Sequence, residues 1–337
     1  MSNKGSFVIS LDFELYWGMF DKVTLEEYGE NIKGVHQAIP EMLALFAQNN
    51  IHATWATVGM LMVENKEALL ASLPAEELQP RYPDMGVSSY EHIKRSNIGN
   101  STTIDPYHFG ADLVEKIIAT AHQELGSHTF SHYYCLDGSD NAKAIFVADC
   151  NAFKTVSERF NRPITSIVFP RNQTTQEALQ MCIEFGFTSY RGTPSHFLYT
   201  GKKEQEQTNL FLRALRLIDT YVNLTGHHTY PTMAVNSHSW KEISGIKNVQ
   251  GSWFLRPYSK TLRAFEWLKL KRIKNAITHA AKKGEIYHLW WHPHNFGINR
   301  KENIQNLLQI IRHFKMLEKE FGMQSVSMSE VARLSNE

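Results

Sequence analysis

Hydrophobic and polar residues alternate along this chain with two different periods. Residues 7–11 form a short apolar run, of the kind expected for a strand covered on both faces, and the run ends abruptly at the carboxylates Asp12 and Glu14. Within 39–46 the large apolar side chains recur at helical spacing, and 53–59 resumes as a strand. The N-terminal part of the chain therefore predicts a β-α-β unit with an acidic pair just beyond its first strand.

The same alternation continues to the C-terminus, with two interruptions. Helices are expected over 111–121, 141–160, 175–185, 261–283, 301–320 and 328–334, and strands over 124–127, 167–169, 189–191, 286–291 and 325–326. Proline and glycine punctuate 73–108, and polar residues between 192 and 256 resist assignment. We expect one domain over 1–337 with insertions at about these two ranges, and a (β/α) barrel of about seven or eight strands is the simplest architecture.

Polar residues with functional chemistry stand at the exits of the expected strands. They are Asp12 and Glu14, His128 and His132, Arg171, and His292 and His294. Strand exits converge on one face of a parallel barrel, which is where such folds place their chemistry. His128 and His132 are four residues apart, so a helical turn or a tight loop can aim both imidazoles at one point. Two imidazoles and one carboxylate leave coordination positions open, which suits Zn²⁺ or another divalent first-row metal.

Composition excludes several classes of partner. The chain has 337 residues, 42% of them hydrophobic, and its 35 Lys+Arg against 34 Asp+Glu leave a formal charge of +1. Such a balance gives no general attraction to nucleic acid or to an anionic membrane. The start of the chain does not resemble a signal peptide, and no run of about 18 apolar residues occurs, so we expect a cytoplasmic protein without an integral membrane segment. The three cysteines, Cys135, Cys150 and Cys182, are expected to be reduced thiols.

Four motifs in a fixed order carry a family resemblance. Ser10-Leu11-Asp12-Phe13-Glu14, Ser127-His128-Thr129-Phe130-Ser131-His132, Phe169-Pro170-Arg171 and Trp290-Trp291-His292-Pro293 resemble the successive motifs of the polysaccharide deacetylase (NodB-homology) family, carbohydrate esterase family 4. The similarity is clearest over roughly residues 5 to 60, 110 to 195 and 283 to 335, and includes the strand at 53–59. This resemblance implies a deformed (β/α)₇ barrel.

The resemblance also implies a ligand set. It makes His128 and His132 metal ligands, with a carboxylate of the first motif as the third. The usual family pattern has two adjacent aspartates, first the base and then the ligand, whereas Phe13 separates Asp12 from Glu14 in this chain. Order of appearance assigns Asp12 as general base and Glu14 as ligand, and the exchange of the two roles stays open.

Two further roles follow from the resemblance. Arg171 resembles the arginine that holds the base, and a guanidinium beside a carboxylate lowers its pKa by roughly 1 to 3 units. The motif around it departs from the family, since it reads Pro170-Arg171-Asn172 where Arg-x-Pro is commoner. His292 resembles the histidine that serves as general acid in the last motif, and His294 takes its place if the strand ends later than expected.

The activity that the resemblance implies is a metal-dependent removal of an N-acetyl group from a sugar. We expect a glycan or a nucleotide- or lipid-linked glycan precursor as substrate, as in surface polysaccharide (O-antigen or capsule) biosynthesis. Another C–N hydrolase on the same scaffold, such as a deformylase or cyclic-amide hydrolase, and a non-catalytic glycan-binding protein are the alternatives. A protease of the His-Glu-x-x-His type is disfavoured because Thr129 stands at the glutamate position.

Overall fold

The computed structural model describes residues 4–137, 141–194, 196, 198, 199, 210–236 and 243–336. Its strands are β1 (Ser6–Phe13), β2 (Ala53–Thr57), β3 (Gln123–Ser127), β4 (Ser166–Ile167), β5 (Ser189–Tyr190), β6 (Tyr230–Pro231), β7 (Lys247–Asn248), β8 (Trp253–Phe254), β9 (Glu285–Trp291) and β10 (Gln324–Val326). They belong to one sheet, in which β9, β1, β2, β3, β4, β5 and β7 follow one another as parallel neighbours.

The short segment that contains β7 and β8 closes this sheet into a barrel. β7 pairs with β5, and the amide of Gly251 donates to the carbonyl of Gly192 at 2.9 Å. A few residues later β8 pairs with β9, and the amide of Ser252 donates to the carbonyl of His288 at 2.8 Å. β7 and β8 together therefore act as a seventh parallel strand between β5 and β9. The deformed (β/α)₇ barrel is confirmed, and the end of the range predicted as an insertion belongs to the barrel wall.

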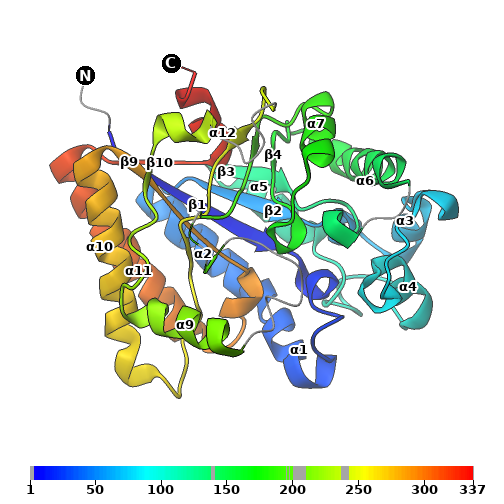
Figure 1. Cartoon of the computed structure of the whole chain (residues 1–337). Helices are drawn as coiled ribbons and strands as arrows, with labels where there is room; N and C mark the ends of the chain where they lie inside the picture. The colour runs from blue at the N-terminus through cyan, green and yellow to red at the C-terminus, as the bar shows by residue number, and fades with distance from the viewer. Residues whose placement is uncertain are drawn as a thin grey trace.

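Helices surround this barrel (Figure 1). They are α1 (Leu25–Lys33), α2 (Val35–Asn49), α3 (Lys66–Ala71), α4 (Ser89–Arg95), α5 (Ala111–Ala119), α6 (Ala142–Ser157), α7 (Gln176–Glu184), α9 (Leu210–Tyr221), α10 (Glu266–Lys283), α11 (Arg300–Phe321) and α12 (Met328–Leu334). α4 and α9 lie in the two ranges where the sequence pattern predicted no element. Among the described helices, none combines the length and the apolar character that crossing a membrane requires.

β1 shows why its sequence is apolar almost throughout. All eight of its residues are buried, because helices cover one face and the barrel interior lies on the other. Phe7, Ile9, Leu11 and Phe13 join the large core cluster under the helices, while Val8 packs with apolar residues of other strands inside the barrel. Ser10 and Asp12 share the inward direction of Val8 because side chains alternate along a strand. The strand thus places Asp12 at the C-terminal end of the barrel interior.

The cysteines agree with the expectation from the sequence. Cys135, Cys150 and Cys182 are free and buried in the structure. All three belong to a second core cluster under α6 and α7, where they pack as small apolar side chains.

Candidate active site

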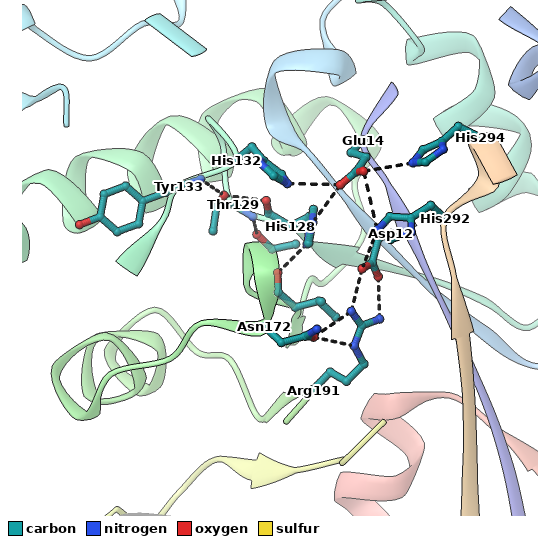
Figure 2. Close-up of polar contacts among 12 residues, drawn as sticks. Asp12, Glu14, His128, Thr129, His132, Tyr133, Asn172, Arg191, His292 and His294 are labelled. Carbon is teal, nitrogen blue, oxygen red and sulfur yellow. Dashed lines mark hydrogen bonds and ion pairs between the residues drawn. The ribbon is translucent and has the colours of Figure 1, made fainter. Parts of the chain in front are cut away.

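Two carboxylates from the end of β1 point into one polar centre (Figure 2). Asp12 is the penultimate residue of the strand, and its side chain is almost fully buried. Glu14 lies just beyond the strand with φ −125° and ψ −15°, and the short helix η1 (Leu15–Gly18) begins after it. The strand therefore ends before Glu14, yet the turn into η1 directs its carboxylate toward the same centre, where it is 3% exposed.

One side of the Glu14 carboxylate faces the histidine pair. Its Oε2 lies 3.5 Å from Nε2 of His128 and 3.2 Å from Nε2 of His132, and both imidazoles are buried. Nδ1 of His128 donates to the carbonyl of Val168 at 2.7 Å, so its Nε2 carries the free lone pair. Such a support on the far nitrogen is usual for a histidine that binds a metal. These three side chains fit Zn²⁺ or another first-row divalent ion, because they offer two imidazole nitrogens and one carboxylate oxygen close to one point.

The histidine pair lies on a tight loop, one of the two conformations that its spacing allowed. Thr129 and His132 have φ of 64° and 58°, so the segment is not a helical turn. Asp149 on α6 holds the loop, because its carboxylate accepts the amides of Phe130 at 2.7 Å and Ser131 at 3.0 Å. The hydroxyl of Ser131 donates to the same carboxylate at 2.5 Å. The loop is thus fixed by a buried residue that the sequence analysis did not single out.

The other side of the Glu14 carboxylate faces a second pair of histidines. Its Oε1 lies 3.2 Å from Nε2 of His294 and 3.7 Å from Nε2 of His292. Nδ1 of His294 is also used, since the hydroxyl of Tyr28 lies 2.9 Å from it. Glu14 with His292 and His294 therefore forms a second group of potential metal ligands among the described residues, and the two groups share Glu14.

Charge around Glu14 keeps this carboxylate ionised. Burial alone would raise its pKa, but the charge of His292 and then the close contacts with the other three histidines hold the pKa well below its ordinary value. An ionised carboxylate is the form that a metal ion binds.

The two histidines of the last motif differ in exposure. The side chain of His292 is 24% exposed, and its Nε2 is 3.7 Å from Oδ2 of Asp12 as well as from Glu14. The side chain of His294 is only 4% exposed, and both of its ring nitrogens have partners. Of the two, His292 is therefore the imidazole that a substrate can reach.

Arg191 forms a two-pronged ion pair with Asp12. Its Nη1 lies 2.6 Å from Oδ1 and its Nη2 lies 2.7 Å from Oδ2, and the guanidinium is 1% exposed. Oδ1 of Asn172 accepts from the same guanidinium, and the ring of Trp290 covers its face at 4.1 Å. Burial acts to raise the pKa of Asp12, but the guanidinium outweighs it, so that the pKa is lowered.

This pairing corrects one assignment from the sequence. Arg171, expected to hold the base, instead pairs with Asp21 at 2.7 Å, and its guanidinium lies over the ring of Tyr134. Its backbone φ of 54° turns it away from the course of a strand. Arg191 follows β5 directly, so it shares the strand-exit position of the other site residues, and that position is the signal that could have found it.

Inside the barrel, hydrogen bonds that run from His288 through Ser10 support Arg191. Nδ1 of His288 lies 3.2 Å from the carbonyl of Val249, which can only accept, so this nitrogen carries the proton. Nε2 of His288 then accepts from the hydroxyl of Ser10 at 2.8 Å, and Ser10 in turn accepts from Nη1 of Arg191 at 3.0 Å. Burial lowers the pKa of His288 to about 3, which keeps it neutral beside the guanidinium.

The segment with His292 and His294 is braced by a close backbone approach. The short helix η10 (Pro293–Phe296) is followed by Gly297, which lies against the corner between α1 and α2. A Cβ atom on Gly34 would stand 2.1 Å from the carbonyl oxygen of Gly297, and one on Gly297 would stand 1.8 Å from that of Asn31. Only glycine fits at both positions. This close contact therefore fixes the position of the segment that carries His292 and His294.

A pocket opens beside the centre. It has a volume of about 260 Å³, and its wall includes Asn172, Phe254 and Trp290. The rings of Phe254 and Trp290 lie 5.7 Å and 5.9 Å from the ring of His292. These two rings therefore connect the pocket wall to His292, although neither His292 nor Asp12 lines the pocket itself.

Comparison with known proteins gives a likeness of fold. No protein-family model matches the sequence, and no curated protein matches it. A Mycobacterium smegmatis protein assigned as a polysaccharide deacetylase has a TM-score of 0.55 at 10% identity, covering 100% of this chain and 91% of its own. A Pseudomonas aeruginosa protein with the same assignment has a TM-score of 0.53 at 11% identity, over 97% and 89% of the two chains. The PuuE allantoinase has a TM-score of 0.52 at 10% identity, also over 97% and 89%.

These structures share the barrel of this chain, as the sequence resemblance predicted. At such identities the likeness concerns the fold alone, and one of the three is an allantoinase rather than a deacetylase. The chemistry of this chain must therefore be argued from its own residues.

Proposed function

We propose that this protein is a metal-dependent hydrolase that removes an N-acetyl group from a sugar of a glycan or glycan precursor. One observation carries the proposal. The Glu14, His128 and His132 group lies beside the ion-paired Asp12 and the accessible His292, whose ring contacts Phe254 and Trp290 in the wall of one pocket. These are the parts that amide hydrolysis needs: a site for a Lewis acid, a base and an acid.

The metal site of the proposal uses Glu14, His128 and His132. When bound there, a divalent ion such as Zn²⁺ would polarise the amide carbonyl and make a water more acidic. We assign Glu14 as the carboxylate ligand because it belongs to both groups of potential ligands, whereas the two oxygens of Asp12 are held by Arg191. The exchange of roles left open by the sequence is thereby disfavoured.

Asp12 and His292 divide the proton transfers in this proposal. Asp12 is ionised and takes a proton from the attacking water, and Arg191 keeps it in place. His292 lies 3.7 Å from Asp12 and contacts Phe254 of the pocket wall, so it can give a proton to the nitrogen that leaves. The C–N bond then breaks to give acetate and a free amine. His294 acts through Glu14, because both of its ring nitrogens are occupied.

The same parts would also hydrolyse other C–N bonds. A formamide places a smaller acyl group on the same nitrogen, and a cyclic amide such as the substrate of an allantoinase presents the same carbonyl chemistry. A glycan-binding protein without catalysis would need neither the accessible His292 nor an ionised Asp12. We therefore rank hydrolysis above binding, and the acyl group is decided by a substrate panel.

Acetate release is the test of this proposal. N-acetylated sugars, N-formylated sugars and allantoin are incubated with the purified protein after loading with Zn²⁺, and the products are quantified. We expect acetate from the N-acetylated sugars, with loss of activity after chelation and in His128→Ala. His279→Ala is a matched control, because that imidazole is 40% exposed and belongs to neither ligand group. Full activity in metal-free protein would refute the proposal.

The setting of the reaction is part of the proposal. We place the substrate among nucleotide- or lipid-linked sugars, in the cytoplasm, where precursors of surface polysaccharides are assembled. We also treat residues 1–337 as a single barrel domain, in which the insertion at 73–108 carries α4 and that between 192 and 256 carries α9. Parts of the second insertion lie outside the described residues.

A further inference from the structure

Two arginines that are not part of the candidate active site line the pocket beside it. Arg216 on α9 and Arg256, which follows β8, both line it, together with the aromatic rings of Tyr199, Trp253 and Trp290. Trp290 contacts His292 and covers Arg191, so its ring joins the pocket to the candidate active site. From the sequence, Arg256 in Arg256-Pro257-Tyr258 is a candidate for contact with a substrate phosphate or carboxylate, whereas Arg216 carries no such signal.

Local contacts orient both arginines but leave their charges uncompensated. Nε of Arg256 donates to the hydroxyl of Thr220 at 2.9 Å, and Nε of Arg216 donates to the carbonyl of Leu198 at 2.7 Å. Among the described residues neither guanidinium has a carboxylate partner. The nearest acid along α9, Asp219, is buried and already paired with Arg272 at 3.0 Å. Within the part of the chain that the structure describes, the terminal amino groups of both arginines are thus left for another partner.

Like charges gather around Arg256. Burial lowers its pKa, and the charges of Arg216 and Arg213 lower it further, while Tyr199 and Tyr221 act in the opposite direction. A partly buried cation among other cations is unfavourable unless an anion enters the site. Guanidinium groups bind phosphate through two parallel hydrogen bonds, and they do so more strongly than they bind neutral acceptors.

We propose that this pocket, hereafter the arginine pocket, binds the phosphate ester of a phosphorylated N-acetyl sugar, while the sugar itself lies against Trp290. Several positive charges, and no carboxylate among the described residues that line the pocket, favour phosphate or diphosphate over a singly charged carboxylate. Aromatic rings flanked by cations suit a sugar that is joined to a phosphate. This inference rests on the proposed function, because it places the acetamido group of the same molecule near Asp12 and His292.

Equilibrium binding tests the arginine pocket without any need for turnover. The dissociation constants of N-acetylglucosamine 1-phosphate, N-acetylglucosamine and inorganic diphosphate are measured by calorimetry on the metal-loaded protein. We expect the phosphorylated sugar to bind about tenfold to a hundredfold more tightly than the neutral one. Arg256→Gln and Arg216→Gln should each remove most of that difference. Arg312→Gln, a matched loss of charge at an exposed position of α11, should leave it unchanged.

Two separate arginine variants are used so that the test still gives an answer if one of them fails to fold. Arg256 is partly buried and bonded to Thr220, so its substitution is checked by thermal unfolding, and Arg216→Gln decides the matter if the first variant unfolds. Equal affinities of wild-type protein for the phosphorylated and neutral sugars would overturn the inference. So would unchanged phosphate binding in both arginine variants, which would assign the phosphate to the metal instead.

Measurements of acetate release distinguish the failure of this inference from the failure of the proposed function. Tight phosphate binding without acetate release would support the arginine pocket and refute deacetylation. Equal kcat/KM for phosphorylated and neutral sugars would support deacetylation and overturn the pocket. UDP-N-acetylglucosamine and a farnesyl-diphosphate-linked N-acetylglucosamine then distinguish the two sources of the phosphate, since the inference expects tenfold or greater arginine dependence for at least one of them.

Discussion

The substitution Gly18→Ala tests the position of Glu14 without changing any of the proposed metal ligands. Gly18 ends η1 directly beside the Glu14 carboxylate, and a Cβ atom on it would stand 2.2 Å from Cδ, 2.3 Å from Oε2 and 2.6 Å from Oε1. Nonbonded carbon and oxygen atoms need more than about 3 Å, so Gly18→Ala must move the carboxylate by roughly 1 Å. The φ of Gly18 is not in the left-handed region, so alanine suits the backbone there.

The expected consequence is a selective loss of metal affinity. Ligand distances in metal sites vary by only about 0.2 Å, so a displacement of this size removes Glu14 from a position where it can share a metal with His128 and His132. Disturbing the support of a ligand commonly costs about tenfold to a hundredfold in affinity or activity, and we expect at least that loss. Replacing a glycine by alanine otherwise stabilises the fold by about 0.4 to 1 kcal/mol through the unfolded chain. The free energy of unfolding should therefore change by no more than about 1 kcal/mol.

The assay compares Gly18→Ala with Gly29→Ala. A Cβ atom on Gly29 would meet its nearest neighbour, in Tyr107, at an ordinary 3.4 Å, so this control introduces the same methyl group without a clash. Zn²⁺ affinity is measured by competition with a chelator, acetate release by kcat, and stability by urea unfolding. Gly29→Ala should match wild type in the first two. Wild-type metal affinity and kcat in Gly18→Ala would refute the placement of Glu14 as a ligand.

Further predictions address the ion pairs and the histidines. Arg191→Gln should lower kcat by at least about tenfold, and Arg171→Gln by much less, since only Arg191 holds Asp12; equal losses would contradict this. Metal analysis should find no bound Zn²⁺ in His128→Ala but one ion per chain, held about tenfold to a hundredfold more weakly, in His294→Ala. A second ion in wild type, lost in His294→Ala, would instead assign Glu14 as a bridge. Glu330→Gln should destabilise the fold by about 1 kcal/mol at pH 7. Burial raises the pKa of Glu330, but a hydrogen bond from His52 holds it below its ordinary value of 4.5; the difference from wild type should therefore vanish as the pH falls through and below 4.5, as urea unfolding would show.

The pattern of the sequence predicted most of the barrel. β1, β2, β3 and β9 and the long helices α10 and α11 lie within a few residues of their expected positions, since their apolar periodicity reflects burial on two faces or on one. The helices α1, α3, α4 and α9 and the seventh strand were missed. β7 and β8 are two residues each and are defined by the strands they join, so no local period marks them.

For the candidate site too, the sequence predicts some features and the tertiary structure alone decides the others. The sequence by itself determined that two carboxylates, two histidine pairs and an arginine stand where strands end, because the order of strand and side chain is local. Which of these groups meet was decided only by the fold. Asp12 takes Arg191 from β5 rather than Arg171, and Glu14 lies between both histidine pairs, because these contacts join residues more than a hundred positions apart. Their geometry depends on how the barrel closes, and the local pattern of hydrophobic and polar residues does not specify that closure.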